Sequence, residues 1–178
     1  MTIVLQTARL TLRPCSPGDR VDFMALERDP DVMRFLNGGQ PVDHDHPDPD
    51  ATFLMPRGTE PHVWTARGTT DGAFVGWFCL WPEDEGTAEL GYRLRRSAWS
   101  RGFASEGALA LLDWGFRSGG YDRIVATTMA VNLGSRRVME KLGMAHLRTT
   151  TFDGPEHIPG SEHGEVWYEV TRSAWKGG

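Results

Sequence analysis

Cysteine is scarce in this chain of 178 residues, because only Cys15 and Cys79 occur and they lie far apart. Two separated thiols do not make a metal-type cluster and favour unpaired cysteines in a reducing compartment. Long apolar runs are lacking too, so we expect no membrane-spanning helix and no membrane partner. Residues 1–15 alternate polar and apolar and lack the apolar core of a signal peptide. These absences predict a cytoplasmic protein.

An excess of positive charge is also missing, since the formal net charge is −5. Non-specific nucleic-acid binding needs a basic face, so we expect no nucleic-acid partner. A mild acidic excess is compatible with cationic substrates such as amines. The length and the 39% hydrophobic content suit one domain with a buried core, and we expect it to cover residues 1–178.

Short segments of alternating or continuous apolar residues predict about seven strands. They cover residues 10–13, 63–66, 73–80, 87–94, 123–128, 145–152 and 165–171. Capping residues and helical spacing predict about four helices. The first begins at Ser16-Pro17 and has an apolar stripe of Val21, Met24 and Ala25, and the second runs from Asp29-Pro30 to about Leu36. The third runs from about Ala104 to Arg117, and the fourth runs from Asn132 to about Leu142. The order of the elements indicates an α/β fold with a mixed sheet covered by helices.

Residues 38–61 are rich in Gly, Pro, Asp and His and show no periodicity. A loop of this length in a small domain is typical of a lid or a binding loop. Residues 43–46 (DHDH) suggest metal ligands, but no predicted helix or strand fixes their geometry. We therefore expect no metal site, and interpret the segment as a solvated acidic loop over a substrate cleft.

Residues 99–106 (WSRGFASE) form a glycine-containing turn that leads into a helix. The free backbone N–H groups and the helix dipole at such a turn favour a phosphate or pyrophosphate. Arg101 and the Ser105 hydroxyl add side-chain donors. The Lys-Ser/Thr pair of a P-loop, the three glycines of a dinucleotide fingerprint and the serine of a nucleophile elbow are all lacking.

Three motifs in order carry a resemblance to one family. Residues 99–107 (WSRGFASEG) resemble the acetyl-CoA pyrophosphate loop of the GCN5-related N-acetyltransferase (GNAT) superfamily, and residues 89–92 (ELGY) resemble the strand before it. Residues 132–135 (NLGS) and 140–144 (EKLGM) are similar to the later family element. Residues 7–13 (TARLTLR) are similar to the opening of the RimJ/RimL-like subgroup, which acetylates the N-termini of ribosomal proteins.

The resemblance implies the acyl-CoA N-acyltransferase fold, with a twisted, mostly antiparallel central sheet, and direct attack of an amine on acetyl-CoA in a ternary complex. The pyrophosphate is expected on the backbone of Ser100 to Ala104, and the pantetheine arm along Tyr92 to Leu94. The implied coenzyme-binding residues are Tyr92, Arg93, Leu94, Trp99, Ser100, Arg101, Gly102, Phe103, Ala104, Ser105, Asn132 and Ser135. Gly91 suggests either a bulge that frees an oxyanion donor or a packing glycine.

The same resemblance implies two catalytic residues. Ser135 is expected to stabilise the departing thiolate, and Glu89 is the candidate base. Further candidates for the base are Glu165, His163, His62, His44 and His46. The sequence departs from the family at Trp99, where many members have Gln or Arg, and at Met139, where many have a Tyr that protonates the thiolate; Met cannot donate a proton.

The acceptor is expected to be a primary amine, either a protein N-terminal α-amine or a small molecule. An α-amine with a pKa of about 8 needs only a weak base, whereas a lysine near about 10.4 needs a stronger one. Two other hypotheses stay open: an acyl-CoA-binding sensor without turnover, and a transferase acting on oxygen or carrying another acyl group. The subgroup also suggests a homodimer.

Overall fold

Eight strands form one mixed sheet in the computed structural model, which describes residues 3–45, 56, 58–153 and 158–177. Their spatial order is β1-β2-β3-β4-β5-β6-β8-β7, and neighbours are antiparallel except β5 and β6. The strands are β1 (Leu5–Gln6), β2 (Leu10–Pro14), β3 (Val63–Gly68), β4 (Phe74–Asp84), β5 (Thr87–Leu94), β6 (Arg123–Met129), β7 (Ala145–Thr150) and β8 (Glu165–Thr171). The predicted mixed, mostly antiparallel sheet is confirmed, and the short edge strand β1 is an addition to it.

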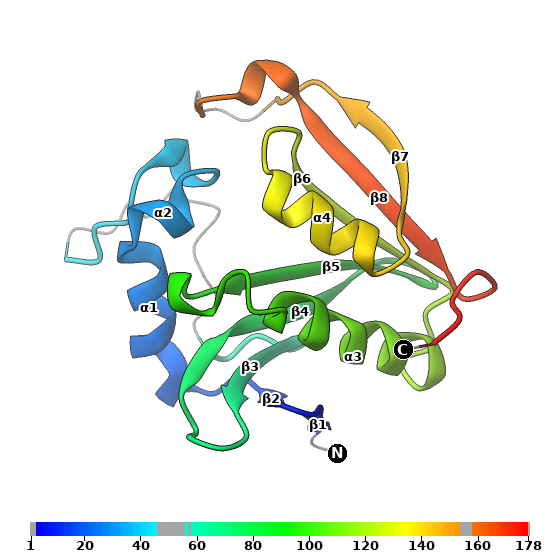
Figure 1. Cartoon of the computed structure of the whole chain (residues 1–178), viewed down its shortest axis with the longest axis horizontal. Helices are drawn as coiled ribbons and strands as arrows, with labels where there is room; N and C mark the ends of the chain where they lie inside the picture. Colours follow the sequence, from blue (N-terminus) through cyan, green and yellow to red (C-terminus); the bar gives the residue numbers. More distant parts are fainter. Residues whose placement is uncertain (1–2, 46–55, 57, 154–157, 178) are drawn as a thin grey trace.

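Two pairs of α-helices pack on opposite faces of this sheet. They are α1 (Arg20–Arg28), α2 (Pro30–Met33), α3 (Phe103–Arg117) and α4 (Leu133–Lys141). Leu111 of α3 and Met139 of α4 share a core cluster with Phe78, whereas Phe23 of α1 shares another with Trp77. Successive strand residues point to opposite faces, so Trp77 and Phe78 separate the two layers. Figure 1 shows α3 and α4 in front of the sheet, and α1 and α2 at its left-hand end.

Strands β5 and β6 separate soon after they begin. Their parallel pairing joins residues 87–89 to residues 123–125, and no pairing beyond Glu89 and Val125 is found in the described part of the chain. Figure 1 shows the two strands close together at the right and diverging to the left. The separation opens a wedge-shaped gap in the middle of the sheet, and the backbone edge of residues 90–94 borders it.

The first helix buries a different stripe from the predicted one. Val21 is 78% exposed, whereas Phe23, Leu26 and Glu27 are buried. The predicted stripe was wrong because α1 packs on the sheet with the face that carries Phe23 and Leu26, which leaves Met24 partly buried and Ala25 exposed. Glu27 is also buried in this helix although it is charged, and its partners are described with the site.

Other element boundaries moved by a few residues. Helix α2 ends at Met33 rather than near Leu36, and Leu36 itself has an extended backbone with φ of −140° and ψ of 159°. Strand β4 continues to Asp84, and β7 ends at Thr150. The two strands predicted over 87–94 and 165–171 are confirmed.

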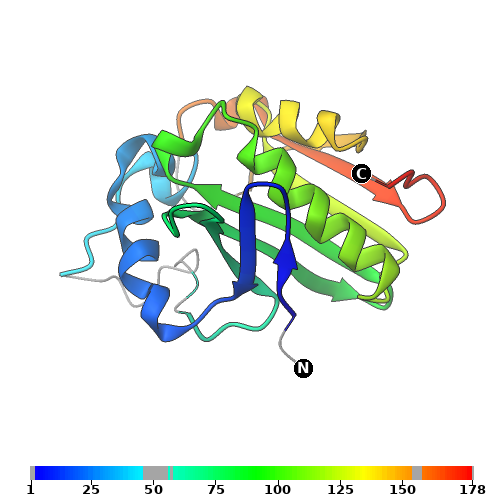
Figure 2. The same cartoon turned by 60° about the horizontal axis from the view of Figure 1, so that its bottom comes forward.

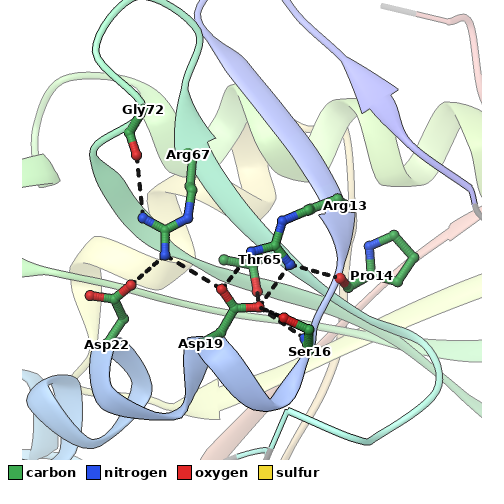
Figure 3. A network of polar contacts seen from close by, with 8 residues as sticks. All are labelled: Arg13, Pro14, Ser16, Asp19, Asp22, Thr65, Arg67 and Gly72. Carbon is green, nitrogen blue, oxygen red and sulfur yellow. Dashed lines mark hydrogen bonds and ion pairs between the residues drawn. The ribbon is translucent and has the colours of Figure 1, made fainter.

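A buried carboxylate fixes the N-terminus of α1 to the sheet (Figure 3). Asp19 is 1% exposed and accepts hydrogen bonds from Arg13 Nη2 at 2.6 Å, Thr65 Oγ1 at 2.8 Å and the Ser16 backbone N–H at 2.9 Å. Burial alone would raise the pKa of Asp19, but the hydrogen bonds from Arg13, Ser16 and Thr65 hold it well below its usual range. The ion pair thus joins β2 and β3 to the helix that covers the second face.

Across the described residues, no helix is both long and apolar enough to cross a bilayer.

Candidate functional site

The turn before α3 has the backbone that an anion site requires. Ser100 and Gly102 both adopt positive φ, at 57° and 83°, and Gly102 is the N-cap residue of α3. Alternating handedness of this kind turns successive N–H groups towards one side, and the helix dipole adds partial positive charge there. The turn is anchored from behind, because Trp99 Nε1 donates to the Leu94 carbonyl oxygen at 2.9 Å. The residue that departs from the common family pattern therefore ties the turn to β5.

Cationic side chains surround this turn. Arg101 is exposed, and its guanidinium carbon lies 4.9 Å from the centre of the Phe103 ring. Ala104 and Ser105 follow in the first turn of α3 and are partly buried. The guanidinium of Arg9 reaches the same ring from the N-terminal hairpin, at 4.4 Å. Sequence analysis missed Arg9, although it lies within the TARLTLR motif that it singled out.

One face of the gap carries Ser135 and the hydroxyl of Tyr92, a residue that was predicted to contact the coenzyme through its backbone. The Tyr92 hydroxyl lies 2.9 Å from Ser135 Oγ and 3.2 Å from the Ser135 carbonyl oxygen, so it joins β5 to α4. Asn132 caps α4, accepting from the Ser135 backbone N–H at 3.2 Å and donating to Thr128 Oγ1 at 3.0 Å. Burial raises the pKa of Tyr92 to about 12, so the phenol stays protonated near neutral pH.

Met139, at the position where many family members carry a tyrosine, is 1% exposed and packs in the core. It offers no group to the gap. The tyrosine hydroxyl near Ser135 comes from β5 instead.

The opposite face of the gap carries Glu89. Glu89 is the last residue of β5 that pairs with β6, and its Oε1 accepts from Thr127 Oγ1 of β6 at 2.8 Å. Burial raises the pKa of Glu89; the Thr127 hydrogen bond opposes this, and repulsion from Glu83 and Glu165 adds to it. A carboxyl group with a raised pKa is a better proton acceptor than an ordinary surface carboxylate.

The bulge considered at Gly91 is not present in the ladder with β4, where Gly91 pairs regularly with Cys79. An added Cβ at Gly91 would lie 2.7 Å from Cys79 Sγ. Gly91 is therefore explained by close packing, and the bulge of this ladder lies between Pro82 and Asp84.

Arg93 and the loop residue His44 meet a buried carboxylate on the same side of the sheet. Glu27, 1% exposed, has Oε2 2.8 Å from His44 Nε2 and Oε1 4.0 Å from Arg93 Nη1. Burial lowers the pKa of Arg93 to about 10, although Glu27 opposes the shift.

The prediction of a solvated loop is wrong for His44, whose side chain is 12% exposed. His46 lies outside the described residues. Leu94, expected along the pantetheine path, is 5% exposed.

The remaining candidates for the base are Glu165, His163 and His62, and they differ in their surroundings. Glu165 begins β8, and burial raises its pKa, with repulsion from Asp153 adding to the effect. His163 is 63% exposed and pairs loosely with Glu162 at 3.6 Å. His62 lies before β3 with φ of 65°. No group of three or more His, Cys, Asp or Glu residues suited to a metal is present among the residues described.

Comparison with known proteins gives this geometry a family context. The family model described as "Acetyltransferase (GNAT) domain" matches residues 9–145. The chain is 35% identical to "FsC-acetyl coenzyme A-N(2)-transacetylase" of Aspergillus fumigatus, over 96% of this chain and 77% of the relative.

Solved structures share the fold at lower identity. A GNAT-family acetyltransferase from Bacillus anthracis superposes with a TM-score of 0.81 at 24% identity, covering 96% of this chain and 99% of the other. "RimL- Ribosomal L7/L12 alpha-N-protein acetyltransferase", solved with coenzyme A, gives 0.71 at 17% identity, covering 95% and 98%. The family match spans most of the chain and includes the turn, the gap and both strands beside it, so the chain belongs to the GNAT acetyltransferase family.

Proposed function

We propose that this protein moves the acetyl group of acetyl-CoA directly to the nitrogen of a primary amine, with both substrates bound together. The observation that carries the proposal is the gap between β5 and β6. Ser135 and Tyr92 lie on its α3–α4 face, and Glu89 lies on the opposite face. Two substrates that enter from the two faces meet inside the sheet, which makes an encounter in solution effectively intramolecular.

The coenzyme is proposed to bind with its pyrophosphate on the N–H groups of residues 100–104 and its pantetheine arm along residues 92–94. The positive φ angles at Ser100 and Gly102 support this placement, as does the unpaired edge of β5. Asn132 and Ser135 then flank the sulfur end of the coenzyme from α4.

The chemistry needs one proton acceptor and one group that stabilises a thiolate. Glu89 accepts a proton from the ammonium group of the substrate, directly or through water, and the neutral amine then attacks the thioester carbonyl carbon. Collapse of the tetrahedral intermediate breaks the C–S bond, and the second nitrogen proton passes to solvent or to the thiolate. Ser135 donates its hydroxyl hydrogen bond to the departing sulfur. A thiol with a pKa of about 8.5 leaves readily at neutral pH, so hydrogen bonding suffices where Met139 cannot supply a proton.

The acceptor is proposed to be an α-amine, that is, an amine on the carbon next to a carbonyl group. The TARLTLR motif supports a RimJ/RimL-like subgroup, and the "N(2)" in the name of the fungal relative supports an amine of this kind. The carboxylates of Glu89 and Glu165 give the acceptor side a negative charge that suits a cation.

Release of free CoA thiol, measured with acetyl-CoA and a panel of amines, tests the proposal. Peptides with a free α-amine should be acetylated faster than the same peptides with a blocked N-terminus and a free lysine. Tight acetyl-CoA binding with no turnover on any amine would favour a sensor, and turnover on alcohols alone would favour an O-acetyltransferase.

A matched pair of glycine variants tests the turn. Gly102→Val should abolish acetyl-CoA binding, because a branched side chain at φ of 83° strains the turn and its Cβ would lie 3.3 Å from Arg9 Nη2. Gly120→Val is the control, since Gly120 has a similar φ of 81°, follows α3 at its other end, and has open space around its Cβ position. Equal loss of binding in both variants would contradict the assignment of the turn.

A further inference from the structure

The turn between β1 and β2 reaches the first turn of α3, 97 positions later in the chain. Figure 2 shows the tip of this dark-blue hairpin beside the beginning of the green helix α3. Glu106 of α3 accepts from the Arg9 backbone N–H at 2.8 Å, from Arg9 Nε at 2.7 Å and from Thr7 Oγ1 at 2.6 Å. Arg9 Nη2 is also 2.6 Å from Glu106 Oε2. The Glu106 carboxylate therefore binds both Thr7 and Arg9 of the hairpin turn.

The Arg9 side chain contacts the turn as well as the helix. Its Nη1 donates to the Arg101 carbonyl oxygen at 3.0 Å, and its guanidinium carbon lies 4.4 Å from the centre of the Phe103 ring. The Cβ position of Gly102 lies 3.3 Å from Arg9 Nη2. Arg9 thus touches three consecutive residues of the turn from outside.

The charges of Glu106 and Arg9 affect how well the turn can bind a phosphate. Glu106 places a negative charge in the first turn of α3, next to the proposed pyrophosphate site. A carboxylate there stabilises the helix dipole, but it also repels a bound phosphate within one Debye length. Burial would raise the pKa of Glu106, yet the hydrogen bonds from Thr7 and Arg9 hold it below its usual range, so the group is ionised at neutral pH.

We propose that Arg9 is a positioning residue of the coenzyme site: it neutralises Glu106 and fixes the carbonyl of Arg101, so that the turn offers its N–H groups to the pyrophosphate of acetyl-CoA. The inference rests on the proposed function, and it adds the N-terminal hairpin to a site otherwise built from β5, α3 and α4. Arg9 acts through the turn and does not touch the reacting atoms.

The test is the effect of Arg9→Ala on the KM for acetyl-CoA. We expect that KM to rise about tenfold, with kcat at saturating acetyl-CoA and the KM for the amine nearly unchanged. Adding Glu106→Gln to Arg9→Ala should recover part of the lost affinity, because the uncompensated carboxylate is then gone. Arg9→Gln, which keeps the length of the side chain but not its charge, should also raise the KM.

Arg172→Ala is the matched control. Arg172 is 45% exposed, against 48% for Arg9, and it likewise pairs with a carboxylate, Asp122, and with a backbone carbonyl, that of Tyr121. The control should leave the KM for acetyl-CoA at the wild-type value.

Two results would overturn the inference: an unchanged KM in Arg9→Ala, or a double variant that binds acetyl-CoA no better than Arg9→Ala does. The second result would mean that Arg9 only holds the hairpin in place. The melting temperature without ligand separates a folding defect from a binding defect. Absence of acetyl-CoA binding in the wild-type protein would instead contradict the proposed function itself.

Discussion

At the scale of single residues, the contact between Tyr92 and Ser135 has a direct chemical consequence. The Tyr92 phenol carries one proton, which it can donate either to the Ser135 carbonyl oxygen or to Ser135 Oγ. In the second arrangement the serine proton is free to point at the sulfur of the coenzyme. With a pKa of about 12, Tyr92 holds its own proton too tightly to pass it to a thiolate, so its part is to orient the serine.

Tyr92→Phe should therefore lower kcat about tenfold while leaving the KM for acetyl-CoA within about twofold, because the serine that hydrogen-bonds to the departing sulfur loses the partner that orients it. The loss should be smaller with acyl donors whose thiols have a lower pKa. In a Ser135→Ala background, Tyr92→Phe should have no further effect. An equal loss in both backgrounds would show that Tyr92 acts independently of Ser135.

Glu89 is the second residue with a testable role. Glu89→Gln should lower kcat about 100-fold at neutral pH, because the amide cannot accept the proton. In the wild-type protein, protonation of Glu89 should cause activity to fall as the pH drops, starting above the usual pKa of a glutamate because burial raises the pKa of this one. Glu165→Gln tests the neighbouring carboxylate in parallel. A profile that keeps the same acidic limb in Glu89→Gln would exclude Glu89 as the base.

At the scale of elements, the ion pair at the start of α1 fixes one wall of the acceptor side. Asp19→Asn should destabilise the protein by about 1–3 kcal/mol, because the buried side chain loses its ion pair with Arg13, whose own side chain is 36% exposed. Asp22→Asn is the matched control. Asp22 is 36% exposed and pairs with Arg67 at 2.5 Å, so it should cost no more than about 1 kcal/mol.

The same pair predicts an acid sensitivity. Because folding lowers the pKa of Asp19, its stabilisation is complete above the pKa of an unfolded aspartate, about 3.9, and is lost as the pH falls below it. Urea denaturation between pH 7 and pH 3 should show a weaker pH dependence in Asp19→Asn than in the wild type. Identical slopes would contradict this account.

Most elements could be predicted from the sequence, because their signals are local. The proline and capping signals preceded α1, α2 and α4, and Asn132 caps α4 as expected. The predictions failed where burial or contacts depend on residues that are far apart in the sequence. The burial of Glu27 depends on partners from β5 and the loop, and the Tyr92–Ser135 contact joins positions 43 residues apart. The alternation of side chains along β5 predicts which face of the sheet Tyr92 lies on, but it does not predict the contact with Ser135.

At the scale of the whole molecule, coenzyme binding should stabilise the fold. Saturation at about 100 times the dissociation constant adds about 2.7 kcal/mol, which for this chain length raises the melting temperature by roughly 5–10 °C. Thermal denaturation with and without acetyl-CoA measures this rise in melting temperature, and Gly102→Val should abolish it. No shift in the wild type at millimolar acetyl-CoA would contradict a specific site. A single domain, a homodimer and a cytoplasmic location stay predictions.

The gap between β5 and β6 also bears on solubility. Among the residues that the structure describes, the side of β5 that faces β6 has no strand partner beyond Glu89, and an unpaired strand edge is a template for pairing with a second chain. Charged edge residues protect the ends of most sheets, but here the open side has to stay accessible to a substrate. We expect the coenzyme to protect against aggregation by occupying that edge, so the protein should remain monodisperse longer in concentrated solution when CoA is present.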